Sequence, residues 1–350
     1  MMRAPLFAAV LGLAACAQVA APVDAVSVAA RVADMIGVAT TVIATEAEAD
    51  AVRERVRAAL VRPLTAETAV QVAVLNNRTL QAEFLAGAEE FAAMEAAVAL
   101  VAATRRAYFE AVAAQQVAGY LEQALASAEA TAELTRRLAQ AGGANRLDQV
   151  RAAELYVEVA NDLRRGRREA TLARQALTRA LGLWGADAAY ALPATLPALP
   201  AALSVPAGAE AEAIRRRVDL AAARHAVEHE GAAAAHRLEA LAIDVRSEVR
   251  AAYATLQSSY EIARAYRDEV VPLRRAIDDE IVYRYNGMLV DVFTVLSTVR
   301  ASLAANVAAI EALRDFHLAE AEFRAALIGG GVVRSGATVV PHAEEQAGGH

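Results

Sequence analysis

The histidines of the second half of the chain are the first residues whose types and spacing could do chemistry. His225 and His229 lie four residues apart, and His236 lies seven further on. In one continuous helix all three would share a face. Two imidazoles at this spacing can bind a transition metal. The competing interpretation is a solvated helix face, since Glu228 and Glu230 lie among them.

A run of acids, Asp278-Asp279-Glu280, lies close to a predicted helix break, and Asp148 lies close to another. These carboxylates could line an entrance, or they could be ordinary charged residues near helix ends. The sequence contains no GxSxG, P-loop or HExxH motif, and its remaining His, Asp and Glu residues are scattered. We therefore expect no enzymatic activity and no cofactor.

The single cysteine, Cys16, closes a run that has the features of an export signal. Arg3 is followed by an apolar stretch too short to span a bilayer, and Leu13-Ala14-Ala15-Cys16 resembles the bacterial lipobox. Residues 1–16 are thus predicted to be a lipoprotein signal peptide, with Cys16 lipidated and anchoring the protein to a membrane face. An ordinary signal peptide is the alternative.

Composition favours closely packed helices. Of 350 residues, 57% are apolar but only 5% are aromatic, and alanine dominates. Alanine is the best helix former and lets helices approach closely. The net charge is −7, lysine is absent, and the arginines form no extended basic stripe. Nucleic acid is therefore not an expected partner.

Turn residues divide the chain into ordered segments. Residues 17–62 are an N-terminal leader, for which we predict a tether with one short helix near its end. In residues 63–183, Thr65 is placed to cap a short helix, and a long helix over 89–139 returns, after Gly142 and Gly143, as a helix over 146–181. Four prolines make residues 184–209 a linker that favours extended chain over the surface.

Residues 210–330 repeat this order. Asp219 is placed to cap a helix, a long helix over 232–284 contains Pro272 as a predicted kink, and a break at Tyr285-Asn286-Gly287 precedes a helix running back from about Val290. The remaining residues, 331–350, are predicted to be a flexible tail.

The two segments are copies of one design. When Val150 is set against Leu296, Leu177 falls on Phe323 and Leu181 on Leu327. Apolar residues three and four apart along these stretches predict amphipathic helices. The predicted fold class is therefore all-α, with two tandem repeats of long antiparallel helical hairpins and little or no β-structure.

This order, over about residues 63–328, resembles the TolC family of bacterial outer-membrane efflux proteins. The resemblance is carried by short motifs along the two repeats: Leu64-Thr65-Ala66-Glu67, Leu75-Asn76-Asn77-Arg78, the matching clusters Arg105-Arg106-Ala107-Tyr108 and Arg250-Ala251-Ala252-Tyr253, Leu147-Asp148-Gln149-Val150, Ala180-Leu181-Gly182-Leu183, Arg217-Val218-Asp219-Leu220 and Arg284-Tyr285-Asn286-Gly287. Each motif is weak alone, and their order and duplication make the match specific.

The resemblance implies a homotrimer whose hairpins form a periplasmic tube, a passive conduit for small molecules or metal ions. Its partners would be a periplasmic adaptor and an inner-membrane efflux pump, and its place the outer membrane. Residues at the hairpin tips would dock the adaptor, and two acids would line the aperture. These candidates are Gly142, Gly143, Asp148, Asn286 and Gly287 for docking, and Asp278 and Asp279 for the aperture.

The sequence departs from the family where its members have two membrane β-hairpins. Leu80 to Tyr108 and Leu220 to Tyr253 are Ala-rich, without alternation or an aromatic girdle. Two membrane strands of about 9–11 residues each would consume most of either interval. Either the chain is a family member shortened to the periplasmic tube and lipid anchor, or its strands escape the pattern. The alternative function is a barrel-less periplasmic coiled-coil lipoprotein with a structural or adaptor-docking role.

Overall fold

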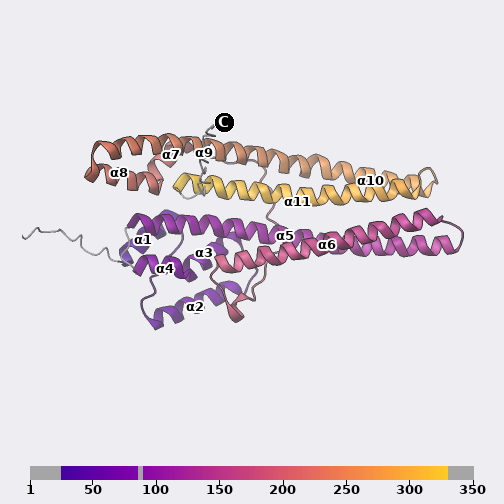
Figure 1. Cartoon of the computed structure of the whole chain (residues 1–350), viewed down its shortest axis with the longest axis horizontal. Helices are drawn as coiled ribbons and strands as arrows, with labels where there is room; N and C mark the ends of the chain where they lie inside the picture. The colour runs from indigo at the N-terminus through magenta and orange to yellow at the C-terminus, as the bar shows by residue number, and fades with distance from the viewer. Residues whose placement is uncertain (1–24, 86–89, 330–350) are drawn as a thin grey trace, which may run out of the picture.

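The computed structural model describes residues 25–85 and 90–329, and every regular element in these ranges is a helix, with no β-strand. Figure 1 shows an elongated molecule in which two long helical hairpins lie side by side with their tips at the same end. The predicted all-α fold of two hairpin repeats is confirmed.

The first hairpin consists of α5 (Glu90–Gln140) and α6 (Arg146–Ala180). Its 51-residue first helix contains no proline and corresponds to a rod of roughly 75 Å at 1.5 Å per residue. Small and aliphatic side chains pack between the two helices toward the tip, among them Ala128, Ala152 and Leu155. Alanine at these positions lets the helix axes come close.

The second hairpin consists of α9 (Ala232–Ala265), α10 (Val271–Asn286) and α11 (Val292–Ile328), with a π turn over Tyr266–Val270. The disruption predicted at Pro272 takes the form of this turn. Proline lacks an N–H, and its ring crowds the carbonyl four residues back. The chain inserts one extra residue, so that the Val271 N–H donates to the Tyr266 carbonyl, five residues back.

Shorter helices gather at the end away from the tips (Figure 1). They are α1 (Ala25–Ile36), α2 (Glu46–Leu60), α3 (Ala66–Asn76), α4 (Arg78–Leu85), α7 (Ala209–Arg216), α8 (Val218–Glu230) and a 3₁₀ turn at Gly185–Ala188. The tether predicted before residue 62 contains α1 as well as the expected helix. Val28, Ala29 and Val32 of α1 are buried in a core shared with α3, α4 and α5.

The predicted cap at Thr65 is confirmed and the one at Asp219 is wrong. The Thr65 hydroxyl accepts from the Thr68 N–H at 3.2 Å, and the Thr68 hydroxyl accepts from the Thr65 N–H at 2.7 Å. Helix α8 instead begins one residue before Asp219, after Arg217. The Asp219 carboxylate accepts from Arg217 and from the Leu220 N–H at 2.9 Å.

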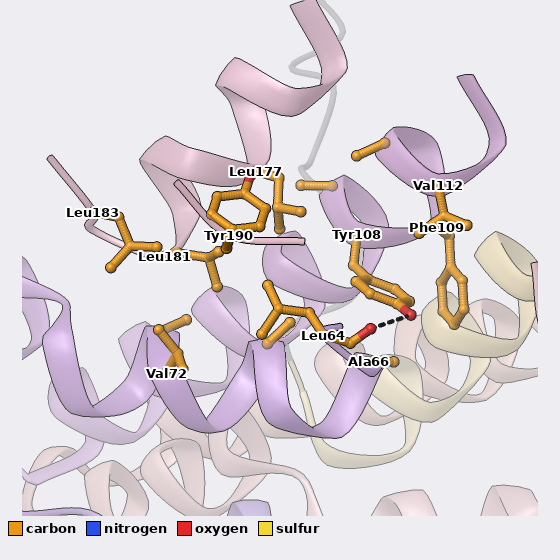
Figure 2. Close-up of a cluster of buried hydrophobic side chains, with 14 of the residues drawn as sticks. Leu64, Ala66, Val72, Tyr108, Phe109, Val112, Leu177, Leu181, Leu183 and Tyr190 are labelled. Carbon is orange, nitrogen blue, oxygen red and sulfur yellow. Dashed lines mark hydrogen bonds between the residues drawn. The ribbon is translucent and has the colours of Figure 1, made fainter. Parts of the chain in front are cut away.

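The largest core lies where α3, α5, α6 and the proline-rich linker meet (Figure 2). The Tyr108 hydroxyl donates to the Leu64 carbonyl at 3.0 Å, which joins α5 to the start of α3. Leu177 of α6 and Leu181, directly after its end, are fully buried beside them. The linker is bound to this body, because the Leu196 N–H donates to the Gln116 side chain at 2.9 Å and the Leu196 side chain is buried.

A buried arginine ties the second repeat together. Arg217, 5% exposed, pairs with Asp219 at 2.7 Å and with Glu248 of α9, and donates to the Ala326 carbonyl of α11 at 3.2 Å. One guanidinium therefore joins α8, α9 and α11. Its five donors in a rigid fork suit this use, which the single ammonium of a lysine could not serve equally.

Replacing this guanidinium is expected to be costly. Arg217→Ala leaves Asp219 and Glu248 without their cation, and we expect a loss of about 3 kcal/mol in the free energy of unfolding. Arg216→Ala is the matched control, because that side chain is exposed and pairs with Glu212 on the surface, so its effect should stay within about 0.5 kcal/mol. Urea unfolding followed by circular dichroism measures both, and equal losses would contradict the assignment.

Candidate functional site

The first hairpin tip is a glycine turn closed by a capping box. Gly142 has φ +80°, a conformation that side chains rarely adopt, and the Gly143 N–H donates to the Leu138 carbonyl at 2.7 Å. Helix α6 then begins with Asn145 as its cap, whose side chain accepts from the Asp148 N–H at 2.9 Å, while the Asp148 carboxylate accepts from the Asn145 N–H. Asp148 thus fixes the tip.

The strained residue of the second tip comes directly after the predicted break at Tyr285-Asn286-Gly287. Asn286 ends α10, and Gly287 has an ordinary φ of −79°. The left-handed residue is Met288, with φ 57°, and its side chain is 93% exposed. Leu289 follows, 73% exposed, with its N–H donating to the Arg284 carbonyl at 2.9 Å. No sequence signal marks Met288, because methionine has no preference for this conformation.

The two tips are held to one another through α6 and α11. Arg300 of α11 pairs with Glu158 at 2.7 Å and with Glu154 at 3.4 Å, both on α6. Nearer the end, the Arg151 guanidinium lies over the Phe293 ring, 4.6 Å from its centroid. The tips therefore present one composite end surface.

Asp291 fixes the direction in which α11 leaves this surface. Its carboxylate caps the helix, accepting from the Thr294 hydroxyl at 2.6 Å and from the Thr294 N–H at 2.9 Å. These hydrogen bonds lower the pKa of Asp291, the hydroxyl most. Asp291 was not among the expected site residues, although an Asp three residues before a Thr at the start of a helix is a recognisable capping pattern.

The two aperture candidates differ in environment. Asp278 is half-buried and accepts from the Ser302 hydroxyl at 2.7 Å, so it helps to hold α10 on α11. Asp279 is exposed. Glu280 pairs with Arg284 of the same helix at 2.7 Å. Of these three acids, only Asp279 has an exposed carboxylate that is free to contact a passing solute.

The three histidines do not share a helical face, contrary to expectation. Gly231, with φ +75°, separates α8 from α9, so His236 lies on a different helix and is 83% exposed in its side chain. His225 and His229 do come together, with ring centroids 4.8 Å apart. Among the residues described, no group of three or more His, Cys, Asp or Glu is placed to hold a metal ion. Cys16, the predicted lipidation site, lies outside the described residues, as do residues 331–350.

Both hairpins leave large apolar side chains exposed along their length. They include Leu134 and Leu138 of α5, Leu147, Val150 and Val157 of α6, Ile243 and Ile262 of α9, Leu273, Ile277 and Val282 of α10, and Phe293 and Val299 of α11. By length and composition α11 could cross a bilayer, yet the core helix of a soluble protein meets the same test. Only 17% of its most apolar stretch is buried within the monomer.

Comparison with known proteins finds this arrangement in solved structures. No protein-family model and no curated protein matches the sequence. A membrane protein from Pseudomonas aeruginosa matches with a TM-score of 0.61 and 19% identity over 86% of this chain and 93% of that one. The CmeC outer membrane channel of Campylobacter jejuni matches with a TM-score of 0.59 and 14% identity, over 76% of this chain and 68% of that one. The outer membrane protein VceC of Vibrio cholerae has a TM-score of 0.57 and 14% identity, over 76% of each chain.

The fold is that of the TolC family. The TolC-like architecture covers both hairpins and their short helices, as the sequence motifs predict. Where the family is expected to carry its β-hairpins, the described residues are helical: α4 and α5 flank residues 86–89 in one repeat, and α8 and α9 meet at Gly231 in the other. Both places lie at the end opposite the tips (Figure 1).

Backbone conformation gives a matched test of the two tips. Gly142→Ala should cost about 1 kcal/mol in the free energy of unfolding, because alanine is strained at φ +80°. Gly287→Ala should be neutral within about 0.5 kcal/mol, since its φ is ordinary and its nearest neighbours would lie 3.5 Å from the added Cβ. Met288→Gly should stabilise by about 1 kcal/mol. Denaturant unfolding measures all three, and a costly Gly287→Ala would refute this tip geometry.

Proposed function

We propose that this protein is a TolC-like conduit of a tripartite efflux system, a passive periplasmic tube through which an inner-membrane pump exports small molecules or metal ions. Three copies would assemble with their hairpins side by side. The observation that carries the proposal is the pair of exposed apolar edges on a fold shared with outer-membrane channels. A long two-hairpin rod buries little of this surface alone, and association buries it.

Assembly follows from where the edges lie. Helices α5 and α11 pack against each other at the centre, so α6 and α9 carry the outer sides of the monomer. The α6 side of one copy and the α9 side of the next are different surfaces. Such a head-to-tail contact closes into a ring when a whole number of copies completes one full turn. A homotrimer is the ring that we propose.

The composite end surface formed by the two tips is the proposed adaptor-docking site. Gly142, Gly143 and Asp148 shape one tip, and Asn286 and Gly287 lead into Met288 at the other. An exposed methionine can adapt to a partner's surface because its side chain is unbranched and polarisable. Asp279 is the stronger aperture candidate, and Asp278 would position α10 behind it.

Cys16 is the proposed attachment to the outer membrane, on its periplasmic side. The family fold of outer-membrane channels supports this location. A diacylated cysteine holds a protein stably on a bilayer without a spanning helix. Residues 25–60 would then connect the anchor directly to the end of the molecule that lies away from the tips (Figure 1).

A charge placed on either edge should break the ring. Val157→Asp on α6 and Ile262→Asp on α9 replace side chains that are 53% and 50% exposed, so neither should unfold the monomer. Burial of an unpaired carboxylate at an interface is strongly unfavourable. Gln257→Asp, which adds the same charge elsewhere on α9, is the control. Light scattering should show trimers for the wild type and the control, and monomers for both variants. A monomeric wild type would refute the proposed homotrimer.

The structural alternative, a barrel-less lipoprotein that acts as a spacer, is favoured by the helices that occupy both β-hairpin positions. The two functions differ in whether solute passes. Purified lipidated protein is added to planar bilayers and its conductance is measured, with Cys16→Ala as the unlipidated control. Discrete conductance steps support a pore. Their absence, with deletion leaving the host's sensitivity to exported compounds unchanged, favours the spacer.

A further inference from the structure

His225 and His229 form a pair of exposed imidazoles on one face of α8. They lie four residues apart, so successive turns of the helix place the two side chains next to each other. Their ring centroids are 4.8 Å apart, with the ring planes tilted by 55°. Within the described residues, neither ring has a hydrogen bond or an ion pair. The nitrogens of both rings are therefore open to a ligand from solvent.

The separation of the two rings suits a shared metal ion. A metal about 2.0 Å from each of two imidazole nitrogens brings these nitrogens to about 3–4 Å from one another. Ring centroids 4.8 Å apart allow this distance, because the nitrogens lie on the perimeters of the rings. The same spacing of two histidines on a helix holds zinc in metalloproteases. Chelation at this pair therefore requires no change in the backbone of α8.

A neighbouring helix limits the freedom of one of the two ligands. The Phe91 ring, in the first turn of α5, lies beside His225, with ring centroids 5.8 Å apart and the ring planes at 55°. Phe91 is itself partly buried. A side chain that is already held by a neighbour loses less rotamer freedom when it binds a ligand. The contact therefore positions the His225 imidazole for binding.

The charges around the pair favour a cation. Helix α8 ends at Glu230, so the pair lies near its C-terminus, where the helix dipole is negative. Glu228, which is exposed between the two histidines in the sequence, has no ion pair among the described residues. Arg224 is the nearest positive charge in the sequence, and it donates to the Ile214 carbonyl at 2.5 Å. A bound cation would thus gain from the helix end and from the Glu228 carboxylate.

We propose that His225 and His229 form a two-imidazole site for a divalent transition metal, with Cu²⁺ bound most tightly and water in the remaining coordination positions. Imidazole suits copper, nickel and zinc, and affinity for a given set of ligands rises to a maximum at Cu²⁺. The described residues supply no third histidine, cysteine or carboxylate placed as a ligand. The site lies on α8, at the end of the molecule away from the hairpin tips (Figure 1). It does not depend on the proposed conduit function.

The test is a titration of the purified full-length protein with CuCl₂, followed by calorimetry and by the electron paramagnetic resonance of the bound ion. We expect one saturable Cu²⁺ site per chain, with a spectrum that shows two nitrogen ligands. Zn²⁺ should bind more weakly. His225→Ala and His229→Ala should each weaken Cu²⁺ binding at least about tenfold, because the second ligand of a chelate binds at a high effective concentration.

Two control variants separate chelation from scattered binding to histidines. His236→Ala removes a single exposed imidazole of α9 and should leave the affinity for Cu²⁺ unchanged. Exchange of neighbours, His229→Glu with Glu230→His, keeps the composition and the charge but sets the histidines five residues apart, about 140° around the helix. This variant should bind as weakly as His229→Ala.

Circular dichroism confirms that each variant is folded, and the titration of the wild type needs no variant. The proposal is overturned if the wild type shows no saturable Cu²⁺ binding at millimolar concentration. It is also overturned if either single alanine variant keeps the affinity of the wild type, if the exchanged variant binds as tightly as the wild type, or if His236→Ala weakens binding as much as His229→Ala.

Discussion

The packing of α5 against α11 is the contact on which the rest of the structure depends. Phe109 stacks on His317, and Arg106 pairs with Glu322 at 2.9 Å across this seam. Each repeat has a buried core of its own, and the contact between α5 and α11 fixes the two repeats against each other. The seam, reinforced by the linker bound to both, decides which helices are central and which sides remain for association.

The seam also explains why two similar repeats end in different environments. Val150 and Leu296 correspond in sequence, yet Val150 is 54% exposed and Leu296 is 1% exposed. Tyr108 is buried with its hydroxyl bound to Leu64, while Tyr253 is 40% exposed. Duplication fixes the helical pattern of both copies. Which of two corresponding residues is buried depends on whether its helix packs against the other hairpin.

The proposed function rests on the ends and edges of this molecule, where local conformation is costly or apolar surface is left uncovered. Met288 keeps a left-handed backbone with its side chain in solvent, a combination that a purely structural turn would assign to glycine. Stability alone does not account for a methionine at this position.

The sequence by itself determined the helices, their breaks and their duplication, since glycine pairs, capping residues and apolar periodicity act within a few residues of one another. Thr65, the turn at Gly142 and Gly143, and the disruption at Pro272 were all predictable on this local basis. Only the tertiary structure decided that Phe109 of α5 stacks on His317 of α11 and that Arg217 joins α8, α9 and α11. These outcomes depend on which distant segments pack together, and no local pattern of residue types encodes that.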